Sequence, residues 1–203
     1  MKEEDIVAGL DAVAKLDKVI AKTLKRAGYP AGRVRERGYR TLLRTIVGQQ
    51  VSVAAANSMW NKLVAFLGED MPPEKLLAAD FDALRACGLS RQKQGYARSL
   101  CELVVSGELD LENLPADDEE AIELLTRIKG IGRWSAEIYL LFAEGRKDIW
   151  PAGDLAVQAG IGKILGMEER PSEKQVRELA EQWRPHRGAV AIFTWHCYNN
   201  PAL

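Results

Sequence analysis

Two closely spaced glycines, Gly130 and Gly132, stand in a short turn between two amphipathic helical stretches, and their spacing suits the binding of a phosphate. Because a glycine has no Cβ atom, each can adopt a positive φ and can let a second chain approach its backbone closely. The helix that follows the turn presents free N–H groups, which attract an anion. The structural alternative is that Gly130 only caps the preceding helix and Gly132 only forms a tight turn.

A second group that could do chemistry is the carboxylate of Asp154. It ends the loop Trp150-Pro151-Ala152-Gly153, directly before an apolar helical stretch. An aspartate in this position is most often an N-cap, and the local pattern alone favours that role. A carboxylate held there can also stabilise a positive charge that develops on a bound molecule.

The turn carries a resemblance to a known family. Residues 124–137, Leu-Leu-Thr-Arg-Ile-Lys-Gly-Ile-Gly-Arg-Trp-Ser-Ala-Glu, resemble the hairpin of the helix-hairpin-helix DNA glycosylase superfamily, which reads approximately Leu-Pro-Gly-Ile-Gly-x-x-Thr-Ala. Lys129 replaces the usual proline and Ser135 the usual threonine. The resemblance implies that backbone amides of the hairpin hold the DNA backbone, often with a bound monovalent cation, without reading bases. The residues that it assigns to this contact are Lys129, Gly130, Ile131, Gly132 and Arg133.

The same resemblance implies that Asp154 is the catalytic aspartate. As a base leaves an N-glycosidic bond, positive charge develops on the deoxyribose, and a nearby carboxylate stabilises it. Members that also cut the strand carry a lysine nucleophile two residues after the second glycine, where this chain has Trp134. A tryptophan cannot form a Schiff base, and 3 scattered cysteines cannot hold the four-cysteine iron–sulfur cluster common in such members. We therefore expect a monofunctional hydrolase that needs no cofactor and leaves an abasic site.

Three further segments resemble the 3-methyladenine DNA glycosylase II (alkyladenine) branch, in a short form that lacks the N-terminal β-domain. They are residues 44–56, residues 87–93, and residues 183–188 together with Trp195, and the resemblance extends over residues 39–198. It implies that Gln49 and one residue of the stretch 90–92 fill the gap left by a flipped base, with Arg91 favoured. The residues placed at the DNA are Gln49, Ser52, Ser90, Arg91 and Lys93. The alternative for Gln49 is a polar residue on an exposed helix face.

The branch also implies a base pocket. Its predicted residues are Trp134, Tyr39, Trp150, His186, Ile138 and Leu155. Purines methylated at N3 or N7 are cations, and the face of Trp134 would attract one by about 1–2 kcal/mol. Ile138 and Leu155 stand where some members have tyrosine, and His186 stands where some have tryptophan, so the range of bases is open. The tryptophans can equally be core residues, and His186 can be a pocket or a surface residue.

Basic and acidic residues are unevenly distributed along the chain. The chain has 203 residues with 28 Lys and Arg against 29 Asp and Glu, but the charges are segregated. The stretch 18–62 is basic except for Glu36, and the stretch 102–124 has no basic residue. On charge alone these are solvated helix surfaces. No bilayer-spanning stretch or signal peptide is found. The resemblance implies a cytoplasmic (bacterial nucleoid) or nuclear protein that acts as a monomer on damaged double-stranded DNA, with no obligate protein partner.

Apolar residues recur at helical spacing, and no strand period appears, so we predict an all-α fold. Residues 6–24 are predicted to form one helix and residues 39–66 two packed helices. Further helices are predicted over 74–79, 80–87, 92–106, 118–128, 133–144, 155–165, 172–182 and 186–198. The resemblance implies two helical lobes with a DNA-binding cleft between them. One comprises residues 30–145 and ends in the hairpin; the other combines residues 1–29 and 146–203 and carries the Asp154 loop.

Two rival functions fit the same residues. The chain could be a helix-hairpin-helix module that binds DNA without catalysis, with Asp154 as a cap only. It could also be a sister glycosylase for neutral bases such as uracil or mispaired adenine. Asp154→Asn should abolish base excision in an enzyme and leave the affinity for DNA intact, whereas a pure binding module has no excision to lose.

Overall fold

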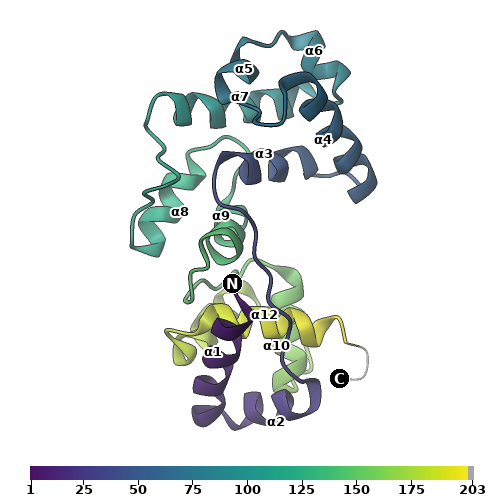
Figure 1. Cartoon of the computed structure of the whole chain (residues 1–203). Coiled ribbons are helices and arrows are strands. Elements are labelled where there is room, and N and C mark those ends of the chain that lie inside the picture. The colour runs from purple at the N-terminus through teal and green to yellow at the C-terminus, as the bar shows by residue number, and fades with distance from the viewer. Residues whose placement is uncertain (201–203) are drawn as a thin grey trace. The chain divides into compact units, whose positions relative to one another are not determined.

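The computed structural model describes residues 1–200, and in that range it contains helices and no β-strand, which confirms the predicted all-α class. The chain forms two compact units (Figure 1). The terminal unit combines Met1–Arg35 with the chain from Glu137 onward, and the middle unit is Glu36–Ala136. Residues 30–35 and 137–145, which we expected in the lobe of the hairpin, belong to the terminal unit. Backbone hydrogen bonds from Arg35 to Phe142 (2.9 Å) and from Arg33 to Met1 (3.1 Å) hold the first of these stretches there.

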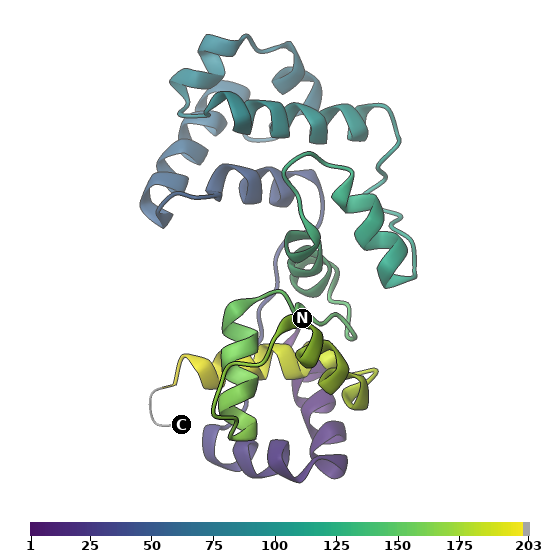
Figure 2. The same ribbon diagram turned by 180° about the vertical axis from the view of Figure 1, so that it is seen from behind.

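The terminal unit is built around its last helix. Its elements are α1 (Glu3–Leu16), α2 (Lys18–Ala27), the π-helical turn η1 (Leu140–Glu144), α10 (Leu155–Leu165), α11 (Glu173–Ala180), the 3-10 turn η2 (Glu181–Trp183) and α12 (Arg187–Tyr198). Helix α12 packs against both α1 and α10, as Figures 1 and 2 show. Glycines permit this approach, because a Cβ on Gly160 of α10 would lie 2.7 Å from Thr194 Cγ2 and one on Gly9 of α1 would lie 2.8 Å from Ala189 Cβ. Helix α12 is thereby held closely against both α10 and α1.

The predicted single helix over residues 6–24 is wrong, because the structure has two helices that meet at Asp17. Asp17 has extended backbone angles (φ −114°, ψ 106°), and its Oδ1 accepts hydrogen bonds from the N–H groups of Val19 (2.9 Å) and Ile20 (3.1 Å). Its Oδ2 accepts the indole N–H of Trp183 at 3.0 Å. The apolar period continues across the break, but a local cap and a distant donor stabilise a helix start at this point.

The middle unit is organised around α7. Its helices are α3 (Tyr39–Gly48), α4 (Val53–Leu67), α5 (Pro73–Ala78), α6 (Phe81–Ala86), α7 (Arg91–Val105) and α8 (Asp118–Thr126). Helix α7 packs against α3, α5 and α6 (Figure 2). Helix α9 (Arg133–Tyr139) begins in this unit and ends in the terminal unit. The apolar face of α3 predicted from the sequence is the buried one, with Leu42, Leu43 and Ile46 at most 1% exposed.

The lengths of the helices and the burial of the cysteines test two expectations about membranes and thiols. No helix within residues 1–200 is both long and apolar enough to cross a bilayer. Cys87, Cys101 and Cys197 are free thiols, and all three are buried. Burial raises the pKa of Cys101 and of Cys197 to about 11, so both thiols are protonated at neutral pH.

Candidate functional site

The glycine turn of the hairpin lies in the middle unit, between the end of α8 and the start of α9. Gly130 has a φ of +83°, in the left-handed region that favours glycine. A Cβ on Gly130 would overlap the aromatic ring of Tyr96, which α7 places directly against it. Gly132 differs, because its φ is not positive and a Cβ there would meet no atom within 4 Å. The fold therefore requires a glycine at position 130, whereas the space at Gly132 is open to an approaching chain.

Two other helices brace the hairpin through its backbone. The side-chain amide of Gln49, at the end of α3, donates to the carbonyl oxygen of Gly130 at 2.8 Å. On α7, Ser99 Oγ accepts the N–H of Lys129 at 3.1 Å. The hydroxyl of Tyr96 in turn accepts a hydrogen bond from the side-chain amide of Gln92 at 2.6 Å. The hairpin is thus shaped before any ligand binds.

These contacts narrow the set of amides that can hold a phosphate. We predicted the amides around Gly130, Ile131 and Gly132, but the N–H of Ile131 donates to the carbonyl oxygen of Ile128 at 3.0 Å. Together with the Lys129–Ser99 bond, this occupies two hairpin donors. The N–H groups of Gly130 and Gly132 donate to no acceptor within residues 1–200. They are the donors that the turn offers to an anion.

The other predicted DNA-binding residues of the middle unit lie around the starts of α4 and α7. Ser52 and Ser90 are the N-caps of these helices, since their Oγ atoms accept the N–H groups of Ala55 (3.2 Å) and Lys93 (3.3 Å). The ammonium group of Lys93 donates to the carbonyl oxygen of Val47 at 2.7 Å, and burial lowers the pKa of this lysine. This contact joins α7 to the end of α3, next to the brace on the hairpin.

Arg91, the residue favoured for the gap left by a flipped base, is exposed. Its guanidinium lies 5.1 Å from the ring centre of Phe81. The contacts of Gln49 with Gly130 and of Lys93 with Val47 bring three predicted segments together. These are residues 47–52, 90–93 and 129–132.

Asp154 lies in the terminal unit and is the N-cap of α10, as the sequence predicts. Its Oδ1 accepts hydrogen bonds from the N–H groups of Ala156 (2.8 Å) and Val157 (3.0 Å). The same oxygen accepts the indole N–H of Trp195, on α12, at 3.2 Å. All three donors meet one oxygen, so they set the orientation of the carboxylate.

The ring of Trp195 is itself held by packing. It stacks on Phe142 of the turn η1, with ring centres 5.7 Å apart and an interplanar angle of 29°. Phe142 is 3% exposed, whereas Trp195 is partly exposed. The capping carboxylate of Asp154 therefore accepts a hydrogen bond from Trp195, which lies far from it in the sequence. A purely local cap does not need this contact.

The comparison with family models covers both the hairpin and the Asp154 loop. The model of the HhH-GPD superfamily of base excision DNA repair proteins matches residues 43–186. The chain belongs to this superfamily. This confirms the relationship to the helix-hairpin-helix DNA glycosylases that the hairpin residues indicated.

Relatives of this HhH-GPD chain extend over nearly its whole length. It is 33% identical over 207 residues to DNA-3-methyladenine glycosylase 1 of Schizosaccharomyces pombe, which covers 96% of this chain and 90% of that protein. The crystal structure of a DNA-3-methyladenine glycosidase from Bacillus halodurans matches it with a TM-score of 0.87 at 30% identity, over 96% of this chain and 89% of the other. The S. pombe enzyme Mag1, in complex with abasic DNA, matches with a TM-score of 0.80 at 31% identity, over 97% and 98% of the two chains.

The residues predicted for the base pocket of this HhH-GPD protein have different surroundings. Trp134 and Leu155 are exposed, by 47% and 61%, whereas Ile138 is buried. His186 is partly buried at the start of α12, near Gly9 of α1. Trp150 is 4% exposed, and its indole N–H donates to the carbonyl oxygen of Val176 at 3.0 Å. It packs edge-on against Trp183 at 5.6 Å, which is the core role that the sequence left open for Trp150.

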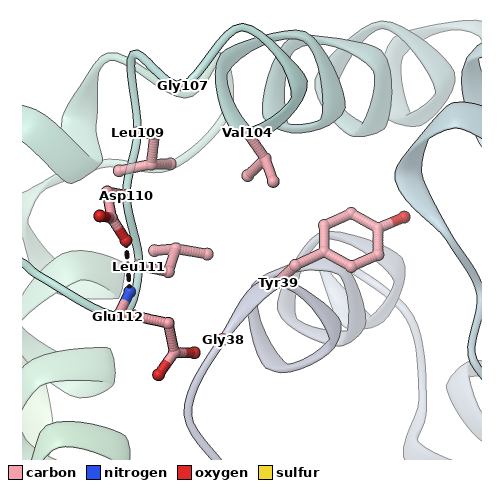
Figure 3. A pocket seen from close by; sticks show the side chains of 8 residues that line it. All are labelled: Gly38, Tyr39, Val104, Gly107, Leu109, Asp110, Leu111 and Glu112. Atoms are coloured by element: carbon pink, nitrogen blue, oxygen red, sulfur yellow. Dashed lines mark hydrogen bonds between the residues drawn. The ribbon is translucent and has the colours of Figure 1, made fainter.

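Tyr39, the sixth predicted pocket residue, lines a cavity of about 330 Å³ within the middle unit. Figure 3 shows its ring facing Val104 and Leu111, with the hydroxyl directed away from Asp110. The hydroxyl accepts the thiol hydrogen of Cys101 at 3.5 Å. Burial raises the pKa of Tyr39 well above its usual range. The cavity is apolar near the ring, and Asp110 and Glu112 lie along one edge.

Sequence reasoning missed the residues that support the site. Tyr96 and Ser99 hold the hairpin, and their signal is helical spacing: with Gln92 they lie on one face of α7. Trp195 was noted only as part of a terminal signature, although its indole N–H donates to Asp154. No local pattern marks Phe142 as its stacking partner.

Proposed function

We propose that this protein is a DNA glycosylase that flips out alkylated, cationic purines such as 3-methyladenine and 7-methylguanine and hydrolyses their N-glycosidic bonds. One observation carries the proposal: in an HhH-GPD chain whose relatives are named 3-methyladenine glycosylases, the Asp154 carboxylate is held by two backbone N–H groups and the Trp195 indole. The reaction leaves an abasic site in base excision repair. The partner is damaged double-stranded DNA, on which the protein acts as a monomer without an obligate protein partner.

Asp154 supplies the electrostatic part of the reaction. A purine methylated at N3 or N7 carries a positive charge and leaves without a general acid, so one carboxylate suffices. At a separation of about 4 Å and an effective dielectric constant of about 20, Asp154 attracts the cationic sugar by about 4 kcal/mol before desolvation, or roughly a thousandfold in rate. The carboxylate also orients the attacking water. Because the hydrogen bonds fix it beforehand, little reorganisation is needed during the reaction.

The hairpin holds the DNA backbone. The N–H groups of Gly130 and Gly132 donate to a phosphate oxygen, with the side chains of Lys129 and Arg133 beside it. A monovalent cation at the hairpin would be bound by backbone carbonyl oxygens. Those of Ile128 and Gly130 each accept one N–H already, from Ile131 and Gln49, and each keeps a second lone pair, so the ligand type fits. The cation would add positive charge at the phosphate.

Trp134 is the candidate for the aromatic residue of the base pocket, since Trp150 is a core residue and Tyr39 lines a cavity within the middle unit. The half-exposed ring of Trp134 attracts a cationic base through its π face. Since Trp134 also stands where strand-cutting members carry a lysine, the protein has no lyase activity. A covalent complex with DNA that borohydride traps would contradict this.

The deciding experiment measures the release of methylated bases from alkylated duplex DNA by the wild type and by Asp154→Asn, with strand cleavage assayed separately. The amide oxygen of asparagine can keep all three hydrogen bonds that Oδ1 accepts, so the variant should fold and should retain DNA affinity while excision falls about a thousandfold. Asp80→Asn is the matched control. Asp80 is an exposed N-cap whose Oδ1 accepts the N–H of Ala83 at 2.7 Å, and the same substitution there should leave excision unchanged.

Each outcome separates the candidate functions. Release by the wild type and by Asp80→Asn but not by Asp154→Asn, without nicking, supports an alkyl-base glycosylase that uses Asp154. Equal release by Asp154→Asn refutes the role of Asp154. No release by any variant, with tight binding to DNA, favours a neutral-base enzyme or a binding module. A uracil-containing duplex, tested in parallel, separates those two.

A further inference from the structure

Arg33 of the terminal unit is fixed on a buried aromatic ring. Its Cζ lies 5.0 Å from the ring centre of Phe142, which is 3% exposed. The backbone around it is held as well, since the N–H of Arg33 donates to the carbonyl oxygen of Met1 at 3.1 Å and that of Arg35 to Phe142 at 2.9 Å. A guanidinium stacked in this way has lost much of its rotational freedom before it meets a ligand.

The ring under Arg33 is the ring that supports the catalytic site. Phe142 stacks with Trp195 at 5.7 Å between ring centres, and the Trp195 indole donates to Asp154 Oδ1 at 3.2 Å. Only two side chains therefore separate Arg33 from the carboxylate. All four residues belong to the terminal unit, so their arrangement is internal to one compact body.

Arg33 also differs from other arginines of the terminal unit in its charge environment. Arg177, Arg184 and Arg187 each form an ion pair with a carboxylate, at 2.7 to 2.9 Å. Arg33 is exposed, and within residues 1–200 no acidic side chain lies within ion-pair distance of it. An exposed guanidinium that is fixed in place and lacks a counter-ion suits an anionic ligand. Its planar fork matches two oxygens of a phosphate.

We propose that Arg33 is a second phosphate-binding residue, which contacts the backbone of the damaged strand next to the nucleotide held at Asp154. The inference rests on the proposed function and adds a contact that the hairpin residues do not provide. Arg33 belongs to the terminal unit, whereas the hairpin turn belongs to the middle unit. Because Arg33 contacts phosphate and no base, it contributes affinity without sequence preference.

The test measures how the affinity for DNA depends on salt. The probe is a fluorescent duplex with a stable abasic-site analogue, titrated between about 50 and 200 mM salt with the wild type, Arg33→Gln, Arg33→Met and Arg33→Lys. One lost phosphate contact lowers the slope of log K against log salt by about 0.9, so the drop in affinity over this range becomes about 3.5-fold smaller. Both neutral variants should show this change. Arg33→Lys, which keeps the charge, should retain most of the wild-type slope.

Arg170→Gln is the matched control, since Arg170 is an exposed arginine of the same unit with no aromatic or ionic contact within residues 1–200. It should leave the slope unchanged. Thermal melting checks that the variants fold. A wild-type slope in both neutral variants overturns the proposal, and so does an equal loss in Arg33→Lys, which would indicate packing alone. Binding of DNA by the wild type that does not depend on salt overturns the proposed function together with it.

Discussion

The two hairpin glycines are chemically identical but should respond in opposite ways to a methyl group. Gly130 has a positive φ and faces the Tyr96 ring, whereas Gly132 has neither constraint. Gly130→Ala should therefore destabilise the fold. Gly132→Ala should leave the fold intact but place a Cβ where we propose that the DNA backbone approaches.

The magnitude follows from two separate costs. An alanine in the left-handed region costs about 1–2 kcal/mol. Relieving the overlap with Tyr96 requires the ring or the hairpin to move, which costs about 1–3 kcal/mol. The sum for Gly130→Ala is about 3 kcal/mol, equivalent to a fall in Tm of about 6–12 °C for a chain of this size. For Gly132→Ala the loss of freedom in the unfolded chain is slightly stabilising, by up to about 1 kcal/mol.

The assay combines thermal melting with DNA titration, and a double variant separates the two costs. In Gly130→Ala/Tyr96→Ala the overlap is removed while the backbone cost remains. The double variant should therefore lose about 1–3 kcal/mol less stability than the two single variants together. Gly132→Ala should melt like the wild type and bind DNA about tenfold more weakly, roughly the loss of one hydrogen bond to a charged phosphate.

Two results would refute this reasoning. The first is an equal Tm for Gly130→Ala and Gly132→Ala, because neither the positive φ nor the Tyr96 contact would then affect stability. The second is strict additivity in the double variant, which would show that the ring does not limit the space at position 130.

Two further predictions concern the carboxylate and the thiols. Trp195→Phe keeps a ring on Phe142 but removes one of the three donors to Asp154 Oδ1. The rate of single-turnover excision should fall about tenfold, with an unchanged Kd for DNA. An unchanged rate would show that the indole N–H does not orient the carboxylate. Because the folded state raises the pKa of Cys101 and Cys197 to about 11, their contribution to stability is complete below the ordinary thiol pKa and is lost as pH rises toward 11. The Tm should fall as the pH of the melting experiment rises from 8 to 11. Both thiols should react with a disulfide reagent only after denaturation, and rapid labelling of the native protein would contradict their burial.

Much of the fold follows from local pattern. The apolar period predicts nearly all helices, because helix formation depends on contacts between residues three and four apart. The cap at Asp154 and the glycine turn are also local, since each is set by a few neighbouring residues. The break at Asp17 was missed because the apolar period continues across it and the donor from Trp183 comes from a distant helix.

The sequence alone shows the residue types of the candidate site: two glycines in a turn, an aspartate that begins a helix, and Trp134 two residues after the second glycine. Only the tertiary structure decided how these groups are held. It placed Gln49, Tyr96 and Ser99 against the hairpin and the indole of Trp195 on Asp154 Oδ1. These contacts join segments far apart in the chain, and they depend on how closely whole helices approach each other. That distance is set by packing at positions such as Gly160, which no local period encodes.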